Sequence, residues 1–225
     1  MRPHLSVLCY GGVHPGVIDC IDREFNRSPF NWSRSFERPD AAVNRARARS
    51  AAHFLYTGQD VLVQLDHDII FQQGNLDYLA LEAFQRSCIV GALVSKKNTA
   101  QGFGGRLPKG RWELGTKAMV ELPEHCYVGG AMTAYSREVF VALSAHTPPT
   151  VHGYHPFFHP IHVLNPALHE VLPEELQEDW AIQRYYRDIY KLGKVYATMW
   201  PVTGHVGQMI FTAIDANPNS QGGAV

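Results

Sequence analysis

The sequence lacks the features that place a protein in a membrane or in an oxidising compartment. No apolar run approaches the roughly 20 residues that a membrane-spanning helix requires. No charged, apolar and small-residue leader is visible near the first residue. Cysteine is scarce and forms no C-x-x-C pair, so we expect reduced thiols that mostly fill the core of a cytoplasmic protein. The four cysteines are Cys9, Cys20, Cys88 and Cys126.

Excess charge of either sign is also absent. The chain has 20 Lys and Arg residues against 21 Asp and Glu residues, a net charge of −1. Such a chain has no general attraction to polyanions, although a local basic patch can still bind one. Hydrophobic residues make up 45% of the 225 residues, enough for one large core. We predict a single domain over residues 1–212 and a flexible tail over residues 213–225, which are rich in Asn, Pro, Ser and Gly.

Strand and helix patterns alternate along the first part of the chain. Short apolar runs predict buried strands, and Ala-rich or amphipathic stretches between them predict helices. This alternation predicts an α/β fold with a mostly parallel sheet flanked by helices. Residues 31–40 are polar and contain a proline, which predicts a loop. The expected strands are 5–10, 60–65, 88–95 and 194–199, and the expected helices are 41–56, 75–86, one that begins at 137, and 174–192.

Two carboxylates follow the apolar run 60–65. Asp66 and Asp68 flank His67, at the end of a strand where ligands of open α/β sheets bind. A hard divalent ion prefers oxygen ligands and commonly bridges to substrate phosphates. The pair therefore indicates a Mg²⁺ or Mn²⁺ site, although a lone D-x-D also suits a solvated turn or a helix cap.

Four motifs lie along the chain in order. They are Asn44-Arg45-Ala46-Arg47 with the strand that leads to Asp66-His67-Asp68, then Tyr127-Val128-Gly129-Gly130, Glu178-Asp179-Trp180, and Gly204-His205-Val206-Gly207. This arrangement resembles the GT-A type of nucleotide-sugar glycosyltransferases, and most of all the small ones of bacteriophages and bacteria, with matches over roughly residues 5–211. The central His67 and the short chain depart from the usual pattern.

The resemblance implies a GT-A (Rossmann-like) fold and a role for each motif. Asp68 and His205 ligate the metal, and Asp66 contacts the donor ribose or completes the metal site. Asp179 is the general base that deprotonates the acceptor hydroxyl. The nucleotide-sugar donor, with a UDP-sugar favoured, contacts Tyr10, Gly11, Asn44, Arg47 and Asp66, and the acceptor side holds Gly129, Gly130 and Trp180.

The same residues also allow plainer interpretations. His205 also suits a hydrogen-bonded loop histidine, and Asp179 also suits a helix N-terminus, where the macrodipole favours a negative charge. On a helix, Arg45 and Arg49 share a face and Arg47 points elsewhere, so at least one of these arginines is expected on the plain surface.

The segment 96–115 combines glycines, cations and Trp112. A mobile lid over the donor, a solvated loop, and a surface for a phosphate backbone all suit this composition. The last interpretation makes a hydroxymethylated base in phage DNA one candidate acceptor, beside a surface glycan and a protein hydroxyl. In that case the protein works in the host cytoplasm. The cations are Lys96, Lys97, Arg106, Lys109 and Arg111.

Two other classes of protein remain open. A nucleotidyltransferase uses a similar sheet and metal, but residues 11–14 after the first strand lack the Gly-rich loop with Arg or Lys expected there. A non-catalytic sugar-binding protein is the second alternative, and the intact acidic and histidine motifs argue against it. The histidines at 152, 155, 159 and 162 lack the helical spacing of a zinc site.

Overall fold

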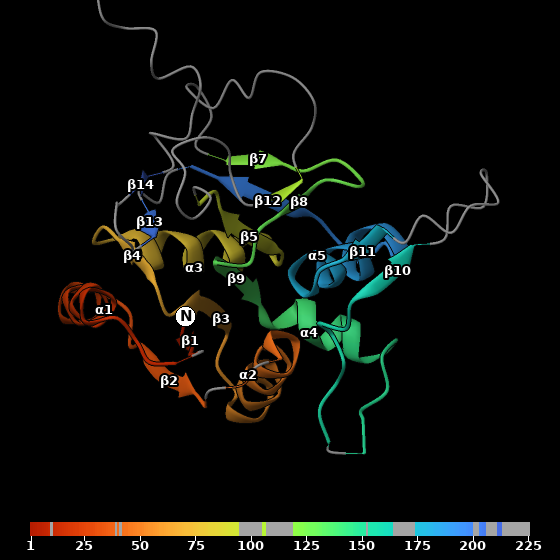
Figure 1. The fold of residues 1–225 in the computed structure, drawn as a ribbon, viewed down its shortest axis with the longest axis horizontal. Coiled ribbons are helices and arrows are strands. Elements are labelled where there is room, and N and C mark those ends of the chain that lie inside the picture. Colours follow the sequence, from red (N-terminus) through yellow and green to blue (C-terminus); the bar gives the residue numbers. More distant parts are fainter. Residues whose placement is uncertain are drawn as a thin grey trace, which may run out of the picture.

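A computed structural model describes residues 1–9, 11–38, 40, 42–94, 105–106, 119–151, 153–163, 174–199, 203–205 and 211–212. Figure 1 shows helices on both sides of a central sheet. In chain order the elements are β1 (Pro3–Leu8), α1 (Pro15–Arg27), β2 (Ser33–Glu37), α2 (Val43–Thr57), β3 (Val61–Asp66), β4 (Ile69–Phe71), α3 (Asn75–Arg86), β5 (Ile89–Ala92), β6 (Gly105–Arg106), β7 (Met119–Glu121), β8 (Tyr127–Val128), β9 (Met132–Ser136), α4 (Arg137–Ser144), β10 (Ile161–Val163), β11 (Glu174–Leu176), α5 (Glu178–Gln183), the π-helical turn η1 (Arg184–Ile189), β12 (Val195–Thr198), β13 (Thr203–His205) and β14 (Phe211–Thr212).

The central sheet has the strand order β2-β1-β3-β9-β5-β12-β7. Strands β2, β1 and β3 are parallel neighbours, and β12 is parallel to β5. Strand β9 lies antiparallel between β3 and β5, and β7 is antiparallel to β12 at the edge. The predicted α/β fold with a mostly parallel sheet is therefore confirmed, and β9 is the main exception to the parallel arrangement.

Each face of the sheet is covered by its own hydrophobic core. Helices α1 and α3 pack on one face and α2, α4 and α5 on the other. Successive side chains of a strand point to opposite faces, so on β3 Val63 faces α1 and α3 while Leu62 faces α2. By the same alternation Gln64 and Asp66 share the face of Leu62. The polar end of β3 is thereby directed toward α2.

A second, smaller sheet extends from the end of β3. Strand β4 follows the turn at His67 and Asp68 and pairs with β13, where His205 lies opposite Ile69. The pairing is antiparallel and brings a late segment of the chain to the D-x-D turn. Cys9, Cys20 and Cys88 are buried and Cys126 is half-buried, and none of the four forms a disulfide. Within the described segments, no helix combines the length and the apolar character that crossing a membrane requires.

Two expectations about local structure were wrong. Residues 31–40 were expected to form a loop, yet β2 (Ser33–Glu37) pairs in parallel with β1. Its residues alternate between half-buried and exposed because it lies at the sheet edge. An edge strand of this kind can be largely polar, and the polar composition therefore led to the prediction of a loop. The helix expected over 174–192 is divided into β11, α5 and η1. By contrast, the helix predicted over 75–86 coincides with α3, and the helix predicted over 41–56 is found as α2, which is capped by Gly58 in a left-handed conformation.

Candidate functional site

The motifs predicted from the sequence meet at the end of β3. Strand β3 stops at Asp66, and the Asp66 N–H donates to the carbonyl of Ala131, at a distance of 2.9 Å. Gly129 and Gly130 precede β9 and therefore lie beside this end of β3. Helix α5, which carries Asp179, contacts both β8 and α2. Segments from three distant parts of the sequence thus form one site.

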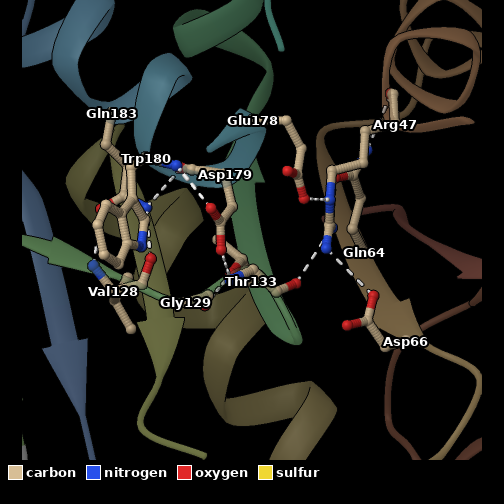
Figure 2. A network of polar contacts seen from close by, with 11 residues as sticks. Arg47, Gln64, Asp66, Val128, Gly129, Thr133, Glu178, Asp179, Trp180 and Gln183 are labelled. Carbon is tan, nitrogen blue, oxygen red and sulfur yellow. Dashed lines mark hydrogen bonds and ion pairs between the residues drawn. The ribbon is translucent and has the colours of Figure 1, made fainter. Parts of the chain in front are cut away.

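Arg47 occupies the centre of this site, with its side chain only 3% exposed. Its guanidinium donates to Asp66 Oδ1 at 3.1 Å and to the carbonyl of Gly130 at 3.1 Å. It also donates to Glu178 Oε1 at 3.4 Å and to Gln64 Oε1 at 3.3 Å (Figure 2). One buried cation therefore joins the end of β3, the start of α5 and the pair Gly129 and Gly130, which we call the glycine segment.

Asp179 lies across the glycine segment from Arg47. Its Oδ2 accepts a hydrogen bond of 2.6 Å from the Gly130 N–H, and its Oδ1 accepts one of 2.9 Å from the Trp180 N–H. Burial and the neighbouring Glu178 carboxylate together raise the pKa of Asp179 to about 6, although Arg47 lowers it. A carboxyl group that titrates near neutral pH is well suited to accept a proton from a substrate.

Asp179 borders a pocket with a volume of about 230 Å³. Trp180 also lines the pocket, and its ring stacks on Tyr127, with ring centroids 5.9 Å apart and the planes inclined at 20°. An aromatic wall beside a carboxylate offers an apolar surface and a proton acceptor to the same ligand. The described lining residues are Gly105, Gly129, Gln177, Glu178, Asp179 and Trp180.

Gln183 attaches α5 to β8 behind this pocket. The side chain is fully buried, and its Oε1 accepts a 3.0 Å hydrogen bond from the Val128 N–H. Its Nε2 donates to the carbonyls of Val128 and Asp179 at 2.7 and 2.8 Å (Figure 2). The orientation of α5, and with it that of Asp179, is therefore fixed by side-chain bonds to the adjacent strand.

Asp68 and His205 lie close to each other where β13 pairs with β4. His205 Nδ1 lies 3.7 Å from Asp68 Oδ2, and both side chains are largely buried. This nitrogen has no hydrogen-bond partner among the described residues. Bonds of about 2.1 Å, typical of magnesium to oxygen and of zinc to a histidine nitrogen, span this separation. The pair therefore fits a shared divalent ion.

The predicted three-residue metal site is not assembled. Among the described residues, no group of three His, Cys, Asp or Glu side chains lies close enough to hold a metal ion. The Asp66 carboxylate binds Arg47 instead, because Gln64 and Asp66 share the face of β3 that α2 covers. The structure thus brings Asp68 and His205 together and places Asp66 beside them, in contact with the buried cation.

No family model matches the chain, and no curated protein matches it either. Among solved structures, A197 from STIV is 15% identical, with a TM-score of 0.57 over 92% of this chain and 86% of that chain. GalNAc-T7, solved with UDP, GalNAc and Mn²⁺, is 13% identical, with a TM-score of 0.56 over 92% of this chain and 44% of that chain. At these identities the likeness concerns the fold. The chain has a GT-A-like α/β fold.

The other site residues predicted from the sequence are either away from the contacts around Arg47 or outside the described residues. Gly11 is exposed just after β1, and Asn44 is half-buried in the first turn of α2. Arg45 and Arg49 both bind Asp40, which confirms that they share a face and that Arg47 points elsewhere. Tyr10, Val206 and Gly207, the tail 213–225 and nearly all of the segment 96–115 lie outside the described residues.

Sequence reasoning did not single out Gln64, Glu178 or Gln183 as site residues. A signal existed for Gln64, because it is the one polar residue inside the apolar run 61–65. A buried polar side chain requires a partner, and the partner here is Arg47. Gln183 lies four residues after Asp179, a spacing that places both on one side of a helix.

Proposed function

We propose that the protein is a metal-dependent glycosyltransferase, which transfers a sugar from a nucleotide-sugar donor to an acceptor hydroxyl. The observation that carries the proposal is the placement of two chemical groups on either side of one buried cation. On one side of Arg47, Asp66 lies beside the pair formed by Asp68 and His205, and on the other side Asp179 borders a pocket. The GT-A-like fold supports the same function.

The donor side consists of the D-x-D turn and strand β13. Asp68 and His205 would hold Mn²⁺ or Mg²⁺, with His205 neutral so that its nitrogen can bind. When bound, the ion neutralises the charge that develops on the departing diphosphate. Asp66, held by Arg47, accepts hydrogen bonds from the donor ribose. GalNAc-T7 was solved with UDP and Mn²⁺, which supports a UDP-sugar and Mn²⁺ as the first donor and metal to test.

The acceptor side consists of α5 and the glycine segment. The acceptor hydroxyl loses its proton to Asp179 while its oxygen forms a bond to the anomeric carbon of the sugar. The bond from that carbon to the phosphate oxygen breaks, and the nucleoside diphosphate leaves. Because the pKa of Asp179 is about 6, the group is ionised at neutral pH yet still basic enough to accept the proton. A single base of this kind suits an inverting reaction.

Donor turnover is the experiment that tests this function. The protein is incubated with common nucleotide sugars and Mn²⁺, and free nucleoside diphosphate is measured. We expect release that EDTA abolishes reversibly and that Asp68→Ala prevents. Release of pyrophosphate from a nucleoside triphosphate and a sugar phosphate would instead identify a nucleotidyltransferase. Binding of sugars without any turnover would identify a non-catalytic protein.

The acceptor class is tested with the same preparation. Hydroxymethylpyrimidine DNA, glycans and proteins are offered with the active donor, and transfer is measured by mass. If DNA is the acceptor, its binding weakens steeply with salt, because cations on the protein displace condensed counterions. Replacing Lys96, Lys97, Arg106 and Lys109 by Ala then lowers transfer to DNA and leaves donor hydrolysis intact. Loss of both activities would indicate a lid over the donor.

A further inference from the structure

We infer that Arg47 is a positioning residue, which holds the catalytic carboxylate Asp179 in a fixed place relative to the donor-side carboxylate Asp66. The inference rests on the proposed function, because it assigns the two carboxylates to the base and to the donor site. Arg47 acts through protein groups on both sides and needs no contact with substrate. This role differs from the direct donor contact predicted for Arg47 from the sequence.

The nitrogens of the guanidinium donate to α5, to β3 and to the Gly130 peptide before β9. Nε donates to Glu178 at the start of α5, and Nη2 donates to Asp66 at the end of β3. Nη1 donates to Gln64 within β3 and to the carbonyl of Gly130 (Figure 2). The planar group has donors in fixed directions, so these bonds set the relative placement of the elements that it joins. A lysine has one nitrogen and cannot reproduce the arrangement.

The Gly130 peptide transmits this placement to Asp179. The Gly130 carbonyl accepts from Arg47, while its own N–H donates to Asp179 Oδ2 at 2.6 Å. Packing here is tight, because a Cβ atom on Gly130 would lie 2.8 Å from Arg47 Nη2 and 2.7 Å from Asp179 Cβ. A displacement of the guanidinium therefore moves the peptide that hydrogen-bonds the base.

Charge reinforces the same arrangement. Asp66 and Glu178 come from different elements, both are mostly buried, and both face Arg47. Without the cation between them, these carboxylates would repel each other and weaken the contact between α5 and the end of β3. Gln64 secures the helix in turn, because its Nε2 donates to the main-chain carbonyl of Arg47 at 3.1 Å. The side chain and the main chain of Arg47 are thus both attached to β3.

The test uses Arg47→Lys, which keeps the charge and loses the directed donors, and Glu178→Gln, which keeps a hydrogen-bond acceptor and loses the charge. Arg49→Lys is the matched control, because Arg49 lies on the same helix and pairs with Asp40 at the surface. All three variants are compared with the wild type in thermal unfolding, in UDP affinity with Mn²⁺, and in kcat and KM for donor turnover.

A positioning role predicts a loss in kcat with little change in donor binding. Arg47→Lys should lower kcat by about 10- to 100-fold, because a small misplacement of a catalytic group has an effect of this size. The affinity for UDP should stay within about threefold of the wild type, since ground-state binding is not what the residue supplies. Adding Glu178→Gln to Arg47→Lys should lower kcat little further, because both changes break the same contact. Unchanged kcat, or weaker UDP binding with unchanged kcat, overturns the inference.

Amide hydrogen exchange gives a reading that is independent of activity. In Arg47→Lys, peptides that contain Gly130 and Trp180 should exchange faster than in Arg49→Lys, because the N–H groups of these two residues bond to Asp179. Equal exchange in the two variants overturns the inference. If the wild type turns over no donor, the proposed function fails, and the exchange result still decides whether Arg47 holds Asp179 in place.

Discussion

At the scale of single residues, Asp179 makes the clearest prediction about chemistry. Its pKa of about 6 lies above that of an ordinary aspartate because the group is buried and faces Glu178. Below this pH the carboxyl is protonated and cannot accept a proton, and above it the carboxylate is free to react. The rate of transfer should therefore rise with pH through about 6 and then level off. A rate that is flat from about pH 5 to about pH 8 would contradict this assignment.

Replacing Asp179 by Asn removes the proton acceptor and keeps the size of the side chain. The rate should fall by about 10²–10⁴. The affinity for UDP with Mn²⁺ should be nearly unchanged, because Asp179 lies on the acceptor side of Arg47. Turnover at the wild-type rate would show that the base lies elsewhere or that the mechanism is retaining.

Gly130 has a close neighbour on either side. The Cβ of an alanine would lie 2.7 Å from Asp179 Cβ and 2.8 Å from Arg47 Nη2, closer than atoms pack. Gly130→Ala should therefore lower the free energy of unfolding by about 1–3 kcal/mol, the usual cost of overpacking. It should also reduce turnover more than UDP binding. Denaturant unfolding and kinetics measure both effects. A variant equal to the wild type in each would show that Gly130 has room for a Cβ atom between Asp179 and Arg47.

At the scale of elements, the buried side chain of Gln183 hydrogen-bonds α5 to β8. Gln183→Leu has a similar size but leaves the N–H and carbonyl of Val128 without their buried partner. We expect a loss of about 2–4 kcal/mol in the free energy of unfolding, because two buried polar groups without a hydrogen-bond partner each carry a desolvation cost. Gln85→Leu, at an exposed position of α3, is the control and should change the stability little. Equal stability of the two variants in urea would refute the attachment.

The sequence predicted several of the elements that form the hydrophobic core, but it did not predict α1 or β9, which also contribute to the core. The apolar runs that became β1, β3 and β5 and the amphipathic α3 have strong periodicity. Strand β2 was missed because an edge strand has no apolar run, and α5 was predicted too long because 174–192 is rich in helix-forming residues. The antiparallel entry of β9 between β3 and β5 depends on pairing between segments far apart in sequence, which local patterns do not encode.

The sequence predicted those residues of the candidate site that belong to recognisable motifs. The D-x-D turn, Asp179 and His205 were identified by their resemblance to glycosyltransferase motifs, and the structure brings Asp68 and His205 together. The ion pair of Asp66 with Arg47 was not predictable. It follows from the alternation of side chains on β3 and from the burial of Arg47, and helix periodicity showed only that Arg47 points away from Arg45 and Arg49.

At the scale of the whole molecule, the pair Asp68 and His205 links the turn after β3 to a late strand of the chain. An ion that binds only the folded state raises its stability, by about 2.7 kcal/mol when the free ion is at 100 times its Kd. Mn²⁺ should therefore raise the Tm of the wild type by several degrees and leave Asp68→Ala and His205→Ala unchanged. Asp22→Ala, which removes an exposed carboxylate, should respond like the wild type. Equal shifts in all four proteins would place the ion elsewhere.

The most direct test of the proposed function is the binding of UDP by calorimetry, with and without Mn²⁺, to the wild type, Asp68→Ala and Asp179→Asn. If the D-x-D turn and His205 form the metal-dependent donor site, Mn²⁺ should tighten UDP binding to the wild type by at least about tenfold, or about 1.4 kcal/mol. Asp68→Ala should lose this gain, and Asp179→Asn should keep it. Binding of UDP that is equal with and without Mn²⁺ in the wild type, or a gain that survives in Asp68→Ala, would contradict the account.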